Sequence, residues 1–270
     1  MGETVAMTLP TRNQPRWIYL LGGLCLAAAV GAIAWWAWPR SGVEADPAPG
    51  PLPLVVMVSG YGGDGRDLAP LVTSLEEQGR TVSVMPPVGD NTGDLSEQAE
   101  ALAAFVQGEL DGAEKVDVIG YSAGGVVSRL WVRDYGGDAV ARRVLTIAAP
   151  HHGTALAGLA DLAGLCDGAC AQLVPDSELL GRLNDGDETP AGPEWISVWS
   201  ENDRTVTPPS TAELEGALTF TVQSVCPNDT PGHAQLPASP VITAALSTVL
   251  GPGAPTAPRP PDVDCQRSSE

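Results

Sequence analysis

A serine lies where a short apolar run meets a helical pattern, at the centre of Gly120-Tyr121-Ser122-Ala123-Gly124. The run Val116–Ile119 has the β-branched apolar character of a buried strand, and helical spacing begins at Ala123. A strand that turns into a helix this sharply holds the serine in a strained conformation, and only small residues two positions away let the backbones pass. The feature predicts an α/β fold with Ser122 exposed at the carboxyl end of a strand.

Short apolar runs alternate with helical patterns over residues 52–250. The predicted strands are Leu52–Val58, Thr81–Met85, Val116–Ile119, Arg143–Ala148, Trp195–Trp199 and Leu218–Val222. The predicted helices between and after them are Asp67–Gln78, Leu95–Leu110, Ala123–Asp134, Thr154–Leu165 and Pro240–Leu250. Continuously apolar strands joined by right-handed crossovers indicate a compact, six-stranded, mostly parallel sheet with helices on both faces. Chemistry in such sheets collects at the carboxyl ends of the strands.

A serine hydroxyl needs a base to become a nucleophile, and the chain has only three histidines. His233 follows the last predicted strand, which is where the histidine falls when the chain order is serine, acid, histidine. His151 and His152 come too early, after the fourth strand, and we expect them to pack or to shape a loop. Ser122 and His233 are therefore the candidate nucleophile and base.

The acid of this order is expected after the penultimate strand, in Ser200-Glu201-Asn202-Asp203. Asp203 is favoured over Glu201 because it lies deeper in the loop, where it can fix the histidine tautomer and stabilise the imidazolium. Other aspartates precede that strand and are poorer candidates, namely Asp176, Asp185 and Asp187.

An oxyanion next to Ser122 needs two hydrogen-bond donors. The first candidate is the backbone N–H of Ala123, at the start of the helix, where the dipole is positive. The second is the backbone N–H of Tyr61, in the glycine-rich loop Ser59–Gly63 after the first strand. The neighbouring glycines let that backbone approach a bound ester closely.

The N-terminal region reads as a membrane segment, because residues 17–38 are uncharged and long enough for about 33 Å of helix. Arginines precede the segment and aromatic residues mark both ends, which predicts a cytoplasmic N-terminus over residues 1–16. A cleaved signal peptide ending at Val43-Glu44-Ala45 is the alternative, and either arrangement exports the rest of the chain. Residues 39–51 are a predicted linker, 52–250 the folded domain and 251–270 a Pro/Gly-rich tail.

The net charge and the cysteines limit which partners and which compartment are expected for this chain. The net charge of -19, from 33 acidic and 14 basic residues, opposes nucleic-acid binding. Four cysteines follow the apolar segment, an even number that predicts disulfides in an oxidising compartment. Three pairings are open, of which Cys166 with Cys170 is the most local and leaves Cys226 to tie down Cys265. None of them has zinc-ligand spacing, so we expect no metal.

Five blocks in order carry a family resemblance. They are Val-Ser-Gly-Tyr-Gly-Gly from residue 58, Gly-Tyr-Ser-Ala-Gly-Gly from 120, Ala-Ala-Pro-His-His-Gly-Thr from 148, Asn-Asp-Arg-Thr-Val-Thr-Pro from 202 and Gly-His at 232. Together they resemble the bacterial triacylglycerol lipase and esterase group of the α/β-hydrolase superfamily. The resemblance implies a catalytic triad of Ser122, Asp203 and His233, with oxyanion donors at Tyr61 and Ala123. One departure is Ser59, where the group usually has histidine before the glycine.

These features predict an exported serine esterase or lipase that acts on lipid or small esters without metal or organic cofactor. An acyltransferase or thioesterase acting on envelope lipids would use the same triad. A non-catalytic anchored binding module is the alternative from another class. The short cysteine-containing segment Asp161–Asp176 leaves little room for a large lid, so strong interfacial activation is not expected. The N-terminal helix would associate the chain with a membrane, unless cleavage releases it.

Overall fold

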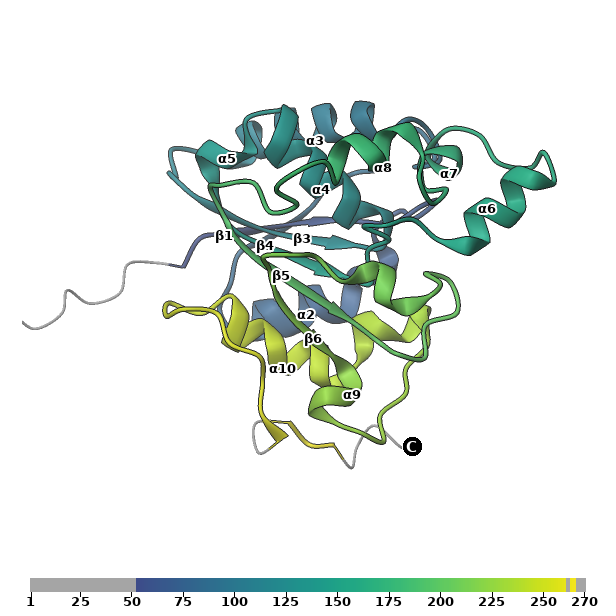
Figure 1. Cartoon of the computed structure of the whole chain (residues 1–270). Helices are drawn as coiled ribbons and strands as arrows, with labels where there is room; N and C mark the ends of the chain where they lie inside the picture. Colours follow the sequence, from purple (N-terminus) through teal and green to yellow (C-terminus); the bar gives the residue numbers. More distant parts are fainter. Residues whose placement is uncertain (1–51, 261–262, 266–270) are drawn as a thin grey trace, which may run out of the picture. The chain divides into compact units, whose positions relative to one another are not determined.

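Six parallel strands form one sheet in the order β2-β1-β3-β4-β5-β6 (Figure 1). The computed structural model describes residues 52–260 and 263–265. The strands are β1 Leu54–Val58, β2 Val82–Val84, β3 Val116–Tyr121, β4 Ala141–Ile147, β5 Glu194–Trp199 and β6 Leu218–Thr221. All six predicted strands are present, and every pairing between neighbours is parallel.

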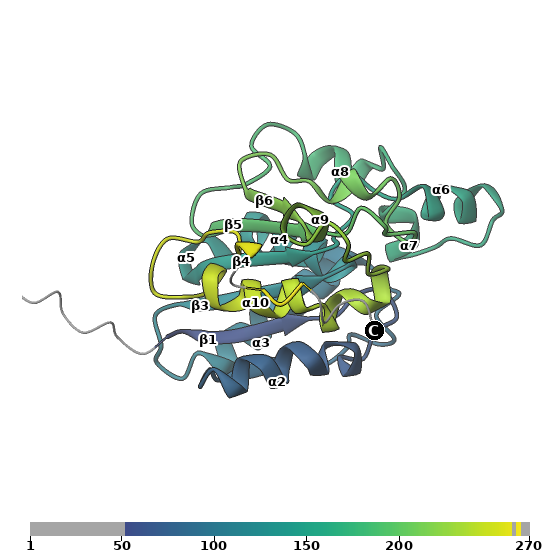
Figure 2. The same ribbon diagram turned by 90° about the horizontal axis from the view of Figure 1, so that it is seen from below.

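Helices cover both faces of this sheet. One face carries α3 Leu95–Glu109 and α4 Ala123–Asp134, and the other carries α2 Ala69–Glu77 and α10 Pro240–Val249 (Figures 1 and 2). The remaining elements are short: η1 Arg66–Leu68, α5 Gly137–Val140, α6 Ala155–Leu162, α7 Ala169–Gln172, α8 Glu178–Leu183, η2 Pro209–Ala212, α9 Val222–Val225 and η3 His233–Ala238. The five predicted helices correspond to α2, α3, α4, α6 and α10, whereas the other short helices are not foreseen by the sequence patterns.

The central strands are apolar throughout because both of their faces are buried. In β1, Val55 and Met57 pack with α2 and α10, while Val56 and Val58 pack with α3 and α4. All four side chains are at most 4% exposed. Side chains of successive strand residues point to opposite faces, so a strand between two helical layers has no polar side.

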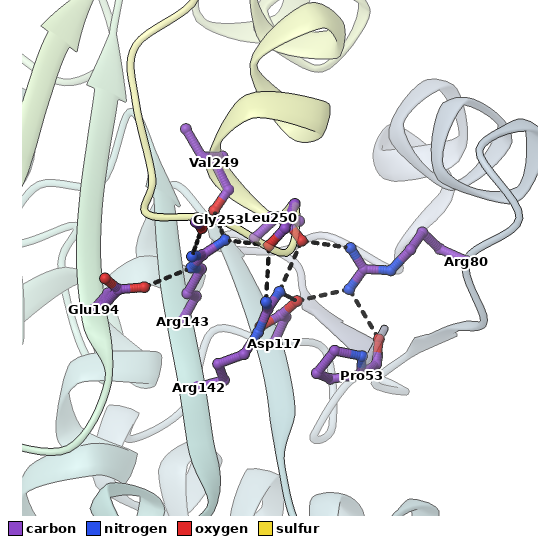
Figure 3. Close-up of polar contacts among 10 residues, drawn as sticks. Pro53, Arg80, Asp117, Arg142, Arg143, Glu194, Val249, Leu250 and Gly253 are labelled. Carbon is purple, nitrogen blue, oxygen red and sulfur yellow. Dashed lines mark hydrogen bonds and ion pairs between the residues drawn. The ribbon is translucent and has the colours of Figure 1, made fainter. Parts of the chain in front are cut away.

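A buried charge cluster ties the amino ends of β3 and β4 to the last helix (Figure 3). The side chain of Asp117 is fully buried between two guanidinium groups. Arg80 Nη2 donates a 2.6 Å hydrogen bond to Asp117 Oδ2, and Arg142 Nε donates a 2.8 Å hydrogen bond to Oδ1. Because both partners are held close to the carboxylate, the desolvation cost of each charge is offset.

The same arginines, with Arg143, receive the carboxyl end of α10 (Figure 3). Arg80 and Arg142 both donate to the backbone oxygen of Leu250, at 2.9 and 2.7 Å. Arg143 donates to the backbone oxygen of Val249 at 2.8 Å and to that of Gly253. Helices end with unpaired carbonyls and a negative dipole, so three cations there fix the position of α10 on the sheet.

The described residues contain two disulfides, which join the pairs set out above. Cys166–Cys170 closes the loop between α6 and α7, with a Cα separation of 5.2 Å. Cys226–Cys265 joins the end of α9 to the tail, with a Cα separation of 5.4 Å. Residues 17–38, the predicted membrane segment, lie outside the described residues. Among the described residues, no helix has the length and apolar character needed to cross a bilayer.

Candidate active site

Ser122 occupies a strained turn between β3 and α4, with φ 54° and ψ −127°. The glycines on either side are required by close backbone contacts. A Cβ at Gly120 would lie 2.5 Å from the backbone oxygen of Gly124, and one at Gly124 would lie 2.3 Å from that of Val58. The strand-to-helix junction therefore presents Ser122 at the carboxyl edge of the sheet, as its glycine spacing predicts.

The structure brings Ser122, His233 and Asp203 together in a hydrogen-bonded row. His233 Nε2 lies 2.9 Å from Ser122 Oγ, and His233 Nδ1 lies 2.7 Å from Asp203 Oδ2. The Asp203 side chain is only 1% exposed, and its Oδ1 accepts hydrogen bonds from the backbone N–H groups of Thr205 and Val206. A carboxylate held this way can orient the imidazole, with Nδ1 protonated and Nε2 free to accept the serine proton.

Tyr121, at the end of β3, supports the histidine and was not singled out by the sequence patterns. Its ring stacks on the His233 imidazole, with centroids 5.1 Å apart, and its hydroxyl donates a 3.0 Å hydrogen bond to the His233 backbone oxygen. Burial, together with the nearby charges of Asp67 and Asp203, raises the pKa of Tyr121 well above its usual range. The phenol therefore stays protonated and keeps its donor.

The loop after β1 lies directly against the serine. A Cβ at Gly60 would be 2.8 Å from the Cβ of Ser122, so only glycine fits at this point. The next residue, Tyr61, makes no hydrogen bond through its N–H to another described residue, and Ala123 is the first residue of α4. First-turn N–H groups lack acceptors within the helix. Both candidate donors are thus available beside Ser122.

Asn91 fixes the shape of this loop, and this residue was missed at the level of sequence. Its Nδ2 donates a 2.9 Å hydrogen bond to the backbone oxygen of Gly63, and its backbone oxygen accepts from the N–H of Gly62 at 3.2 Å. The φ of Asn91 is +59°, a left-handed conformation that asparagine tolerates. An asparagine within the turn Asp90–Gly93 was therefore the sequence signal that could have identified this residue. Ser59, at the departure from the family pattern, is buried, with its hydroxyl 3.5 Å from Asp67.

An apolar cavity of about 160 Å³ opens beside Ser122. Its wall comes from the loop after β1, from α6 and α7, and from the loop that follows β5. The lining residues are Tyr61, Ser122, Pro150, Thr154, Leu156, Ala157, Ala160, Cys170, Leu173, Thr205 and Val206. No lysine, arginine, aspartate or glutamate is among them, so the cavity suits an apolar group attached to the reacting centre.

The other two histidines lie apart from this row. His151 is fully buried, its Nε2 is 3.0 Å from Thr146 Oγ1, and burial lowers its pKa well below the usual value of 6.5. His152 Nε2 pairs with Glu188 at 2.8 Å. Glu201, the less favoured acid, is exposed and accepts from Thr221 instead of reaching His233. Within the described residues, no group of three or more His, Cys, Asp or Glu side chains could hold a metal ion.

Solved structures show which fold this is. Lipase B of Aspergillus fumigatus matches with a TM-score of 0.67 at 18% identity, over 80% of this chain and 56% of that one. The mature form of the lipase BlEst2 from Bacillus licheniformis matches with a TM-score of 0.60 at 19% identity, over 76% of this chain and 93% of that one. The match thus spans little more than half of the fungal lipase. The shared architecture is the α/β-hydrolase fold.

The family follows from the sequence itself. A profile described as Lipase (class 2) matches residues 100–243, which is more than half of the 270 residues and includes Ser122, Asp203 and His233. The chain therefore belongs to the class 2 lipase family. None of the curated proteins matches it.

Proposed function

We propose that this chain is an exported serine esterase or lipase in which Ser122, His233 and Asp203 form the catalytic triad of an acyl-enzyme mechanism. One observation carries the proposal. The imidazole of His233 lies within hydrogen-bond distance of both Ser122 Oγ, at 2.9 Å, and Asp203 Oδ2, at 2.7 Å, beside an apolar cavity. Nucleophile, base and orienting acid at these distances are the elements that acyl transfer needs.

In the first half of the reaction, Ser122 Oγ attacks the ester carbonyl carbon while His233 Nε2 takes the serine proton. Asp203 stabilises the imidazolium that forms, while the backbone N–H groups of Thr205 and Val206 hold its carboxylate in place. The carbonyl oxygen becomes an oxyanion that accepts hydrogen bonds from the N–H groups of Tyr61 and Ala123. The C–O bond to the alcohol then breaks, and His233 returns its proton to the leaving alcohol. An acyl group remains on Ser122.

In the second half, water takes the place of the alcohol. His233 removes a proton from water, the hydroxide attacks the acyl carbon, and the same two N–H groups hold the second oxyanion. Collapse breaks the bond to Ser122 Oγ, which regains its proton from His233. The apolar lining from Leu156, Ala157 and Leu173 suits the acyl chain or another apolar part of the ester.

The export part of the proposal is supported by two disulfides, which persist in oxidising compartments, and by the uncharged segment 17–38. The chain would then be a single-pass membrane protein with its hydrolase domain outside, or a secreted one after cleavage. Protease added to intact cells should degrade or release the hydrolase domain and leave cytosolic markers intact. Protection equal to that of the markers would contradict export.

Catalysis is tested on the full-length chain with a fluorophosphonate probe and p-nitrophenyl esters of increasing chain length. The wild type should be labelled and turn over the esters, whereas Ser122→Ala should do neither. Ser210→Ala, at an exposed serine, is the matched control and should behave as wild type. Labelling of Ser122→Ala equal to that of wild type would refute the assignment. Acyl transfer to an added alcohol without hydrolysis would favour the acyltransferase alternative.

The acid is tested by Asp203→Asn, with Glu201→Gln as its control in the same loop. An amide in place of the carboxylate favours the wrong imidazole tautomer, so kcat should fall by about 10⁴ by analogy with other triads. Glu201→Gln should keep full turnover because Glu201 faces Thr221. Full activity of Asp203→Asn would reassign the role.

A further inference from the structure

Four leucines on and just after α6 face solvent. Leu156, Leu159, Leu162 and Leu165 follow one another at three-residue spacing and are 51%, 66%, 85% and 80% exposed. We call these four side chains the leucine ridge. Ala157 is the one residue of α6 that is buried. A surface helix normally turns its apolar stripe toward the core, so the ridge is unusual in turning it outward.

The exposed apolar side chains are concentrated around α6 and the cavity. Six large apolar side chains are exposed among the described residues: Leu52, Tyr61 and the four of the leucine ridge. Five of these six belong to the ridge or to the cavity wall, and only Leu52, ahead of β1, does not. Figures 1 and 2 both show α6 extending outward from the body, beyond the sheet. A concentration of this kind marks an interaction surface more than scattered leucines would.

The ridge is continuous with the candidate active site. Leu156 belongs to both, because it lines the cavity beside Ser122 and is also half exposed. Ala157 and Ala160 of the same helix line the cavity, while Leu159 and Leu162 are exposed and are not part of its lining. An apolar chain could therefore pass from the ridge into the cavity without crossing a charged side chain.

Both ends of this segment are fastened to the body. Thr154 Oγ1 donates a 2.7 Å hydrogen bond to the backbone oxygen of Thr205, and Ala155 N–H donates a 2.8 Å bond to that of Thr207. Beyond the ridge, the Cys166–Cys170 disulfide constrains the loop, and Ala169 N–H donates to the backbone oxygen of Thr92 at 2.9 Å. The leucines are thus presented in a fixed arrangement beside an already open cavity.

The charged side chains around the leucine ridge limit which kind of lipid surface can cover it. The chain has no lysine or arginine between Arg143 and Arg182, and the exposed Asp161 and Asp167 flank the leucines. These carboxylates and the net charge of -19 oppose an anionic lipid surface, although the exposed Arg204 lies next to the cavity-lining Thr205. An uncharged or zwitterionic lipid surface is not repelled, so contact with it is decided by the apolar side chains.

We propose that the leucine ridge docks the enzyme on the surface of an uncharged or zwitterionic lipid aggregate, with the cavity mouth facing that surface. The inference rests on the proposed function, because docking has this purpose only where Ser122 cleaves a lipid ester. Burial of leucines in the acyl region supplies the affinity, and an acyl chain moves along Leu156 into the cavity.

The test uses residues 52–270, which carry the sheet and both disulfides but not the predicted membrane segment, with and without the double change Leu162→Gln/Leu165→Gln. These are the two most exposed leucines, and neither lines the cavity. Soluble-ester turnover equal to that of the full-length chain shows that the shortened chain is folded. Leu52→Gln is the matched control, since it replaces an exposed leucine outside the ridge. Turnover is measured on an emulsified neutral triacylglycerol and on a water-soluble short-chain ester. The double variant should need about 100-fold more emulsion surface for half-maximal rate, about tenfold per leucine, with turnover of the soluble ester unchanged. Coating the emulsion with an anionic phospholipid should lower the wild-type rate.

Flotation with the emulsion separates docking from catalysis. In the shortened chain, Ser122→Ala should float, and Ser122→Ala combined with the double variant should remain in solution. Equal flotation, or equal emulsion turnover, by the shortened chain with and without the double change would overturn the docking proposal. Dissociation of a dimer by the double variant, with flotation unchanged, would overturn it in favour of contact between two copies. Absence of soluble-ester turnover in the wild type would instead refute the proposed function.

Discussion

The ring of Tyr121 stacks on the imidazole of His233 at a centroid separation of 5.1 Å, and its hydroxyl donates a 3.0 Å hydrogen bond to the His233 backbone oxygen. Tyr121 also immediately precedes Ser122. One side chain therefore links the strand that carries the candidate nucleophile to the loop that carries the candidate base. Asp203 lies within hydrogen-bond distance of Nδ1 of the imidazole. Tyr121 stacks on the ring and donates a hydrogen bond to the backbone oxygen of His233.

Tyr121→Phe should lower kcat about tenfold while KM stays unchanged, because it removes the hydrogen bond to His233 but keeps the stacked ring; a lost buried hydrogen bond costs on the order of 1 kcal/mol. Tyr121→Leu should lower kcat further, since it removes both contacts. Tyr135→Phe, at a tyrosine after α4, is the control for a general effect on folding. Unchanged kcat in Tyr121→Phe would show that the hydroxyl does not position the histidine.

Asn91 is the next target, because it shapes the loop that carries the Tyr61 N–H. Asn91→Gly keeps the left-handed backbone conformation at φ 59° but removes the side-chain bonds to Gly63 and to the N–H of Val88. We expect kcat to fall between about 10-fold and 100-fold, below the 10²–10³ seen when an oxyanion donor is removed outright. The fluorophosphonate labelling rate should fall in parallel. If turnover is retained while thermal stability drops, Asn91 supports the fold alone.

The row of Ser122, Asp203 and His233 could be read from the sequence because each residue follows a predicted strand, and parallel strands bring their carboxyl ends to one edge. Tyr121 and Asn91 could not be found this way, since their contacts join segments that only the folded chain brings together. Tyr121 reads as an ordinary strand residue, and its partner lies 112 positions away.

The sheet was predictable for a related reason. Apolar runs such as β1 are buried on both faces, so their composition alone marks them as central strands. Short helices such as α8 carry too few residues for a periodic pattern and depend on local contacts, as where Ser177 caps its first turn. In α6 the apolar residues indicate a helix but not which way it faces, and the structure turns the leucines outward.

Acid should weaken the fold through His151. This imidazole is fully buried and its pKa lies well below 6.5, so the unfolded chain binds a proton near that pH that the folded chain does not. Stability from this group is complete above pH 6.5 and is lost as the pH falls below it. His151→Gln removes the group, so the stability advantage of wild type over the variant should shrink as the pH falls from 8 to 5. Urea unfolding at both pH values measures this, and a constant difference would contradict it.

Asp117 tests whether the charge cluster at the far edge of the sheet is needed for stability rather than catalysis. Its side chain is fully buried, and that of Arg80 is 3% exposed, so Asp117→Asn leaves a buried guanidinium without its counter-charge. Loss of one partner of such a pair costs about 3–5 kcal/mol. The arginines also hold the carboxyl end of α10, so unfolding in urea should shift to a markedly lower urea concentration.

The soluble-ester kcat of the folded Asp117→Asn protein should stay unchanged, because the cluster lies at the amino ends of β3 and β4, away from Ser122. Asp134→Asn is the control, because both side chains of its pair with Arg182 are exposed and its loss should cost only about 0–1 kcal/mol. Equal destabilisation by the two variants would show that burial of the Asp117 pair does not set its contribution.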